Sequence, residues 1–229
     1  MTPASTAPGT DRPGPGDPDQ PGPDQHDPDQ HGLGHASPGQ AQPGSAGQDL
    51  AGPGPGGPAA VVIALGSNLG DRLAHLQAAV DTLAAAPGIS VTAVSPVYQT
   101  DPVGGPDQPD YYNAVLLART TLPPAGVLAA AHAAEAAEQR TRTIRWGPRT
   151  LDVDIISYGG VTSTDPELTL PHPRAHERAF VLVPWHDVDP AAELPGHGPV
   201  ADLIAGLTGP AGLAGDGLRR AGAGLRRPS

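Results

Sequence analysis

The composition of the chain changes abruptly near Ala60, and this change confines a folded domain to the middle of the sequence. Residues 1–58 consist mainly of Pro, Gly, Asp, Gln, Ser and His, with near-repeats such as GDPDQ and HDPDQ. Because this segment has almost no large apolar side chains, burial cannot offset the entropy of ordering it. We therefore predict a disordered tail over 1–58, a folded domain over 59–208, and a flexible Gly- and Arg-rich tail over 209–229.

The charges limit the partners of the chain. The formal net charge is −11, and all 13 Lys+Arg residues are Arg. This strong negative charge argues against nucleic-acid binding, which needs clustered positive charge. Four of the arginines nevertheless lie between Arg140 and Arg149, so we expect that stretch to bind an anion.

The sequence also indicates a compartment. It contains 0 Cys, which excludes disulfides, thiolate metal sites and thiol nucleophiles. It has no apolar stretch near the roughly 18 residues of a membrane-spanning helix and no apolar signal-peptide core at its start. We expect a cytoplasmic protein with no membrane partner.

Periodicity in the middle of the chain predicts alternating strands and helices. Strands are indicated by continuous or alternating apolar runs, and helices by a 3.6-residue period after Asp71 and after Pro123. The expected elements are a strand over 60–68, a helix over 71–85, strands over 89–98 and 111–120, a helix over 123–138 and a strand over 151–160. This order predicts an α+β fold, a ferredoxin-like βαββαβ sandwich with a C-terminal extension.

The strongest local feature is the segment RWGPRTLDVDII, residues 145–156. Asp152 and Asp154 are two residues apart on a predicted strand, so both carboxylates point to one face with Cα atoms about 6.5–7 Å apart. That arrangement suits one hard cation, or two cations bridged by carboxylate and phosphate oxygens. The alternative is a pair that simply faces solvent on an open sheet.

The arginines before this pair favour the metal interpretation. Metal ions and arginine forks together neutralise a polyphosphate, and four arginines precede the pair: Arg140, Arg142, Arg145 and Arg149. Taken alone, such a run is typical of a solvated surface loop. Beside two strand carboxylates it indicates a metal-dependent site that binds a polyphosphate.

Four segments in this order resemble the 6-hydroxymethyl-7,8-dihydropterin pyrophosphokinase family of the folate pathway. They are ALGSNLGDR (64–72), YQTDPVGGPDQPDYYN (98–113), RWGPRTLDVDII (145–156) and LPHPRAHERAFVLVP (170–184). The resemblance implies transfer of pyrophosphate from ATP to 6-hydroxymethyl-7,8-dihydropterin, giving AMP and the pterin pyrophosphate. It also implies two Mg²⁺ ions on Asp152 and Asp154, and a monomer.

The resemblance further implies the roles of individual residues. Arg140 and Arg142 correspond to catalytic arginines that also contact ATP, Arg142 being the closer candidate for transition-state contact. The implied ATP contacts further include Glu135, Arg145, Trp146, Arg149, His172 and Arg178. The implied pterin contacts are Thr100, Val103, Tyr111, Asn113, Trp146 and Phe180, with Tyr111 and Phe180 on either side of the ring.

Two departures and two alternatives stay open. The segment between Arg142 and Arg145 is one residue shorter than in familiar members, and Pro173 stands where some members carry Tyr. One alternative is another magnesium-dependent ATP group transferase that acts on a different heterocyclic alcohol. The other is a ferredoxin-like nucleic-acid-binding module, which the aromatic content of 3% and the negative charge disfavour.

Overall fold

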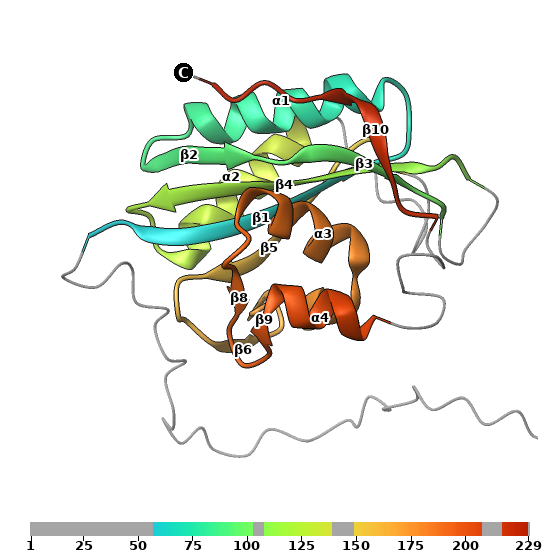
Figure 1. Ribbon diagram of the computed structural model, residues 1–229. Coiled ribbons are helices and arrows are strands. Elements are labelled where there is room, and N and C mark those ends of the chain that lie inside the picture. The colour runs from blue at the N-terminus through green and yellow to red at the C-terminus, as the bar shows by residue number, and fades with distance from the viewer. Residues whose placement is uncertain (1–56, 103–107, 139–148, 208–216, 229) are drawn as a thin grey trace, which may run out of the picture. The chain divides into compact units, whose positions relative to one another are not determined.

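The computed structural model describes residues 57–102, 108–138, 149–207 and 217–228. These residues form a mixed α/β fold built on an antiparallel sheet (Figure 1). Its strands are β1 (Ala59–Ser67), β2 (Ile89–Val94), β3 (Pro96–Thr100), β4 (Tyr111–Thr120), β5 (Asp152–Tyr158) and β10 (Arg219–Gly224). The strand order is β10-β3-β4-β1-β5, and β2 also pairs with β4.

Four helices are described, and they cover both faces of the sheet. Their bounds are α1 (Arg72–Ala85), α2 (Pro124–Ala137), α3 (Ala179–Val188) and α4 (Val200–Gly206). Helices α1 and α2 pack on one face, and α3 with α4 packs on the other (Figure 1). None of the helices in the described ranges is long and apolar enough to cross a membrane.

Alternation along the central strand β1 builds two separate cores. Ile63 and Leu65 point into a cluster with the helices α1 and α2, whereas Val62 joins the cluster beneath α3. Both faces of the strand are therefore apolar, which explains its continuous apolar run. We refer below to the face covered by α3 as the α3 face.

The remaining elements are short. They are β6 (Ser163–Asp165), β7 (Leu168–Leu170), the 3₁₀ helix η1 (Ala175–Glu177), β8 (Glu193–Leu194) and β9 (Gly198–Pro199). Strands β6 and β7 pair as one hairpin, and β8 pairs with β9 as another. They belong to the segments that connect β5 to α3 and α3 to α4.

The expected order of strands and helices is confirmed, with one difference at Ser95. The single strand expected over 89–98 is two strands, β2 and β3, and both pair with β4. Between them Ser95 is buried, and its hydroxyl oxygen accepts a hydrogen bond from the Val115 N–H at 2.9 Å. Its hydroxyl donates to the Pro96 carbonyl at 2.8 Å, and these two bonds replace regular pairing at the break.

The prediction of a flexible C-terminal tail is wrong for the described residues 217–228. Residues Arg219–Gly224 form β10, an edge strand that pairs antiparallel with β3. Beyond it, Gln77 on α1 exchanges two hydrogen bonds with the backbone of Arg226, at 2.8 and 3.1 Å. The Gly-rich composition hid these contacts, because main-chain pairing and arginine side chains hold the segment together with only two partly buried apolar residues, Ala221 and Leu225. The predicted tail over 1–58 lies outside the described residues, apart from its last two.

Candidate active site

Asp152 and Asp154 lie on the α3 face of β5. Val153 and Ile155 alternate with them and are buried in the core beneath α1 and α2, so the two carboxylates point the opposite way. Both carboxylates meet arginines: Arg149 lies 2.6 Å from Asp152, and Arg178 lies 3.7 Å from Asp154. The pair is thus part of a charged cluster rather than two carboxylates on an open solvated face.

The two neighbouring carboxylates of this cluster are suitable ligands for a cation. Burial and, to a smaller extent, the nearby Asp152 carboxylate together raise the pKa of Asp154 to about 6, and the charge of Arg178 opposes this shift. Two carboxylates that repel each other are the hard oxygen ligands that Mg²⁺ prefers. Among the described residues no group of three or more His, Cys, Asp or Glu gathers as a metal site. A metal ion here would therefore complete its coordination with water or substrate oxygens.

Helix α3 delivers a second cation and an aromatic ring to the same face. Arg178 occupies the residue before α3, and its side chain is only 24% exposed. Its guanidinium lies 5.6 Å from the centre of the Phe180 ring. Phe180 itself packs against the core cluster beneath α3. The start of α3 therefore presents a positive charge and an apolar surface next to Asp154.

His172 lies close to this cluster and is neutral. Burial and, to a smaller extent, the positive charge of Arg178 together lower its pKa to about 4. Its Nδ1 atom accepts a hydrogen bond from the Arg174 N–H at 3.2 Å. The imidazole thus presents its Nε2–H as a donor, which is the form suited to a phosphate oxygen.

We expect the His172 ring to titrate near pH 4 in an NMR pH series of the full chain. Because the folded-state pKa lies below the ordinary 6.5, the neutral form is favoured on folding, and this contribution is lost as the pH falls through the range from 6.5 to 4. Arg178→Gln should move the titration upward by removing a positive charge. A His172 midpoint near 6.5 would contradict the assignment.

Three polar or aromatic residues expected to contact pterin lie together on the α3 face. Thr100 and Asn113 are buried, and the Asn113 amide donates to the Thr100 hydroxyl at 2.9 Å. Tyr111 starts β4, and its hydroxyl donates to Gln108 Oε1 at 3.2 Å. Burial raises the pKa of the Tyr111 phenol, and the charge of Arg149 opposes this shift. The phenol therefore lies near the Arg149 guanidinium.

The surface formed by Thr100, Tyr111 and Asn113 is called the polar wall below. Gly66 explains why this wall comes so close to the carboxylates. It lies on β1 between its cross-strand partners Asn113 and Asp152. A Cβ atom built there would lie 3.4 Å from Asn113 Oδ1 and 3.9 Å from the Asp152 Cβ. The absence of a side chain leaves an uninterrupted surface from the amide of Asn113 to the carboxylate of Asp152.

Glu135 is placed differently from the other expected contacts. It lies on α2, it is buried, and its Oε1 accepts a hydrogen bond from the Val153 N–H at 2.9 Å. This bond joins α2 to β5, the strand that carries both aspartates. The contact of Glu135 with ATP stays a prediction.

The other expected site residues lie outside the described residues. They are Val103 in the range 103–107, and Arg140, Arg142, Arg145 and Trp146 in the range 139–148. Their roles stay predictions from the sequence.

Asn68 is a positioning residue that the sequence reasoning did not identify. It is buried, and its Oδ1 accepts from the Arg149 N–H at 2.8 Å. Its amide nitrogen donates to Gln108 Oε1 at 2.9 Å and to the Pro109 carbonyl at 3.2 Å. Asn68 therefore joins the segment that carries Arg149 to the segment that precedes Tyr111. A buried Asn directly after a strand was the available signal, but its partners are distant in sequence.

We expect Asn68→Ala to lower the free energy of unfolding by about 2–4 kcal/mol, because it removes three hydrogen bonds and leaves buried polar groups without partners. Urea unfolding of the full chain measures this loss. Thr92→Val is a suitable control, since the Thr92 hydroxyl makes one exposed bond to the Leu117 carbonyl. If both variants lie within about 0.5 kcal/mol of the parent chain, Asn68 does not hold these segments.

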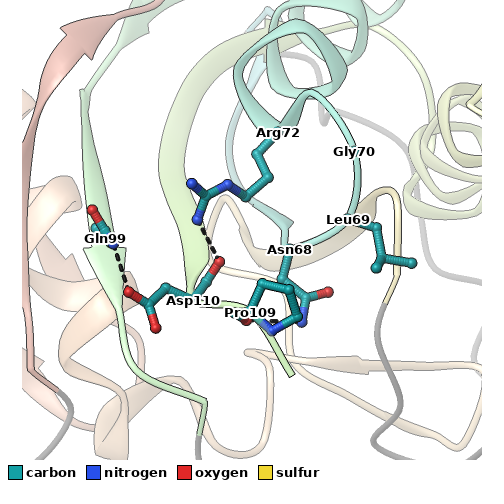
Figure 2. Close-up of a pocket in the computed structure, with 7 residues that line it drawn as sticks. All are labelled: Asn68, Leu69, Gly70, Arg72, Gln99, Pro109 and Asp110. Carbon is teal, nitrogen blue, oxygen red and sulfur yellow. Dashed lines mark hydrogen bonds between the residues drawn. The ribbon is translucent and has the colours of Figure 1, made fainter. Parts of the chain in front are cut away.

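A separate pocket of about 480 Å³ opens beside the start of α1. Figure 2 shows its lining, in which Arg72 donates to the Asp110 carbonyl and Gln99 to the Asp110 carboxylate. Neither Asp152 nor Asp154 lines it. This pocket is therefore distinct from the surface that carries the two carboxylates.

A carboxylate pair flanked by arginines, next to an amide- and tyrosine-lined wall, is the arrangement of an enzyme that handles phosphate groups beside a ring-shaped substrate. Residues 62–190 match the family model described as 7,8-dihydro-6-hydroxymethylpterin-pyrophosphokinase. The match spans more than half of the chain and includes every described site residue. The chain belongs to this family.

Curated relatives agree. The chain is 47% identical over 160 residues to 2-amino-4-hydroxy-6-hydroxymethyldihydropteridine pyrophosphokinase of Mycobacterium bovis, an alignment covering 64% of this chain and 83% of that protein. It is 42% identical over 145 residues to the enzyme of the same name from Pseudomonas aeruginosa, covering 63% and 90% of the two chains.

A solved structure supports the fold alone. It is a crystal structure of HPPK-DHPS in complex with substrates, with a TM-score of 0.50 and 10% sequence identity. The alignment covers 64% of this chain and 43% of that longer chain, so the likeness does not extend to the rest of that protein.

Proposed function

We propose that the α3 face is where this chain carries out the reaction of its family. The chain is a diphosphotransferase of folate biosynthesis that transfers pyrophosphate from ATP to 6-hydroxymethyl-7,8-dihydropterin. The products are AMP and the pterin pyrophosphate. The observation that carries the assignment is the pair Asp152 and Asp154, flanked by Arg149 and Arg178. Gly66 alone separates Asp152 from Asn113 across the sheet.

The two carboxylates would hold magnesium. The donor set fits, because both ligands are hard oxygens on one face of a strand. Burial, and after it the repulsion from Asp152, raises the pKa of Asp154, and a bound cation would offset both effects. When bound, Mg²⁺ neutralises charge on the phosphate oxygens that are transferred and released. We propose two ions, since a triphosphate that is cleaved between its α- and β-phosphorus atoms gains from charge neutralisation on both sides.

The described cations would bind the phosphates. Arg149 pairs with Asp152, and Arg178 with Asp154. With the carboxylates engaged by a metal ion, both guanidinium groups would be available to phosphate oxygens. The neutral His172 would donate one further hydrogen bond. Arg140, Arg142, Arg145 and Trp146 are proposed to join them from the range 139–148, and Glu135 to contact the nucleotide.

The polar wall would bind the pterin. Asn113 has one amide hydrogen in its bond to Thr100 and retains its carbonyl oxygen for the ring edge. Tyr111 and Phe180 would lie on either side of the ring, and backbone groups near Thr100 and Val103 would complete its hydrogen bonds. The chain thereby orients the hydroxymethyl oxygen toward the β-phosphorus, which is the main source of rate in such a transfer.

We further propose the ferredoxin-like βαββαβ arrangement for the domain. The support is the order of the strands in the sheet. In the βαββαβ pattern β1 is the first strand, β2 with β3 the second, β4 the third and β5 the fourth. Strands β4 and β5 flank β1, and β2 and β3 lie beyond β4. The monomeric state and the cytoplasmic location stay predictions.

Product analysis tests the function. Full-length chain is incubated with ATP, Mg²⁺ and 6-hydroxymethyl-7,8-dihydropterin, and nucleotides and pterins are separated by chromatography. We expect AMP and pterin pyrophosphate in equal amounts, both dependent on the pterin. ADP in place of AMP would indicate transfer of a single phosphate, and absence of pterin-dependent turnover by folded protein would contradict the assignment.

A further inference from the structure

Arg219 on the C-terminal strand β10 contacts both ends of the 101–110 segment, which connects Thr100 to Tyr111. We call these two ends, Asp101 and Asp110, the stems of the segment. Arg219, the first residue of β10, lies 3.0 Å from the Asp101 carboxylate and 2.6 Å from the Asp110 carboxylate. Asp101 directly follows Thr100, and Asp110 directly precedes Tyr111. One guanidinium thus links the two points where the chain leaves β3 and enters β4.

Gly217 shows that the approach to Asp101 is close. Its φ is +56°, and a Cβ built there would lie only 2.3 Å from the Asp101 Oδ2 atom. The Gly217 carbonyl also accepts a hydrogen bond from Arg219 at 2.8 Å. A residue with a side chain would displace the Asp101 carboxylate from the arginine, so the turn before β10 and the pair at Asp101 depend on each other.

Asp110 is the second anchor, and it is held from three directions. Its Oδ2 accepts from Arg219 and from Gln99 Nε2, each at 2.6 Å, while its carbonyl accepts from Arg72 at 2.7 Å. Figure 2 shows the contacts of Gln99 and Arg72 on the wall of the pocket beside α1. Because Gln99 lies opposite Arg219 in the pairing of β3 with β10, strand pairing brings both donors to one carboxylate.

We propose that Arg219 is a positioning residue for the pterin-binding wall. Thr100 and Tyr111, the two proposed pterin contacts next to these carboxylates, are cross-strand partners at the end of the β3–β4 pairing. By bridging Asp101 and Asp110 just beyond that pair, Arg219 keeps the end of the pairing closed, and through Thr100 it supports the amide of Asn113. The C-terminal strand therefore contributes to recognition of the ring-shaped substrate and not to binding of ATP. This inference rests on the proposed function of the α3 face.

The exposure of these groups indicates that Arg219 affects the local position of the stems and contributes little to the global stability of the domain. The side chains of Arg219, Asp101 and Asp110 are 46%, 56% and 33% exposed. Exposed ion pairs contribute little to the global stability of a domain, because solvent screens them. Loss of Arg219 should therefore leave the fold intact and change only the local separation of the two stems.

Binding measurements on the full chain test the proposal. Pterin affinity is followed by fluorescence in the presence of a non-hydrolysable ATP analogue, and affinity for the analogue is measured separately. We expect Arg219→Gln to weaken pterin binding about 3- to 10-fold. This is the range expected when two exposed ion pairs that position one binding surface are lost. Affinity for the analogue and the unfolding midpoint should be unchanged. Arg219→Lys should be intermediate, because an ammonium keeps the charge but lacks the planar fork that directs separate N–H groups to the two carboxylates.

Arg227→Gln is the matched control. Arg227 lies in the same C-terminal segment but donates to the Thr92 carbonyl, at 3.0 Å and away from the 101–110 stems. This variant should bind pterin like the parent chain. Unchanged pterin affinity in Arg219→Gln, or equal weakening of both ligands with a lower unfolding midpoint, would overturn the proposal.

Amide hydrogen exchange in the ligand-free chain separates this proposal from the proposed function. Arg219→Gln should accelerate exchange at the Asp101 and Tyr111 amides, whereas Arg227→Gln should not. Unchanged exchange at both amides would overturn the positioning role even if the parent chain makes pterin pyrophosphate. Conversely, a parent chain that is inactive with pterin would contradict the proposed function while exchange still reports on the link between the stems.

Discussion

Asp154→Asn is expected to lower kcat by about 10³-fold or more while the domain stays folded, because it removes a negatively charged ligand from the proposed metal site at the reacting phosphates. The side chains of Asp and Asn have nearly the same shape, so the α3 face should keep its packing. The rate of AMP formation at saturating Mg²⁺, ATP and pterin measures the effect. A loss of only a few-fold would show that Asp154 does not hold the metal.

The same substitution should increase stability when no metal is present. The pKa of Asp154 is raised from 3.8 to about 6, so its ionised form disfavours folding above pH 6, and this cost disappears as the pH falls toward 4. Because the side chain is 39% exposed, solvent screening limits the expected gain at pH 7 to about 1 kcal/mol. Asp81→Asn is the control: it removes the same charge from an exposed position on α1 and should leave both rate and stability unchanged.

Arg178→Gln is expected to lower kcat/KM for ATP by about 10²- to 10³-fold, the size of effect seen when one preorganised donor to a developing charge is lost. Arg178 is mostly buried, lies 3.7 Å from Asp154 and is fixed at the start of α3. Glutamine keeps a donor but loses the charge and the fork geometry. Steady-state kinetics with ATP varied at saturating pterin measures the loss.

Arg174→Gln provides the comparison. Arg174 lies four residues earlier, its side chain is 54% exposed, and it pairs with Glu177 at 3.4 Å. Its loss should change kcat/KM less than about twofold, because an exposed pair outside the cluster contributes little. If both variants lose activity equally, net positive charge near η1 rather than a specific phosphate contact of Arg178 explains the effect.

Local patterns were sufficient to predict the main elements of the fold. The apolar run of β1, the cap of α1 at Asp71 and the prolines at the start of α2 are each encoded within a few residues, and each element lies where its pattern predicts. The common direction of Asp152 and Asp154 follows from strand periodicity alone. Their neighbours Arg178 and His172 could be assigned only through the family resemblance.

Contacts between distant segments were not predictable in this way. Asn68 meets Gln108 and Arg149 across 40 and 81 residues, and nothing near Asn68 in the sequence indicates either partner. Arg219 likewise meets Asp101 across 118 residues, from a segment whose glycines suggested a flexible tail. Side-chain hydrogen bonds and ion pairs of this kind depend on the tertiary arrangement, which local periodicity does not encode.

The most direct test of the account is to locate the metal. Crystals of the full chain grown with Mn²⁺, a non-hydrolysable ATP analogue and 6-hydroxymethyl-7,8-dihydropterin would give anomalous scattering peaks at bound Mn²⁺. We predict peaks within coordination distance of both Asp152 and Asp154, with the β-phosphate of the analogue between the metal and the hydroxymethyl oxygen of the pterin. Mn²⁺ and nucleotide bound away from the α3 face, with Asp152 and Asp154 still paired to Arg149 and Arg178, would contradict the account.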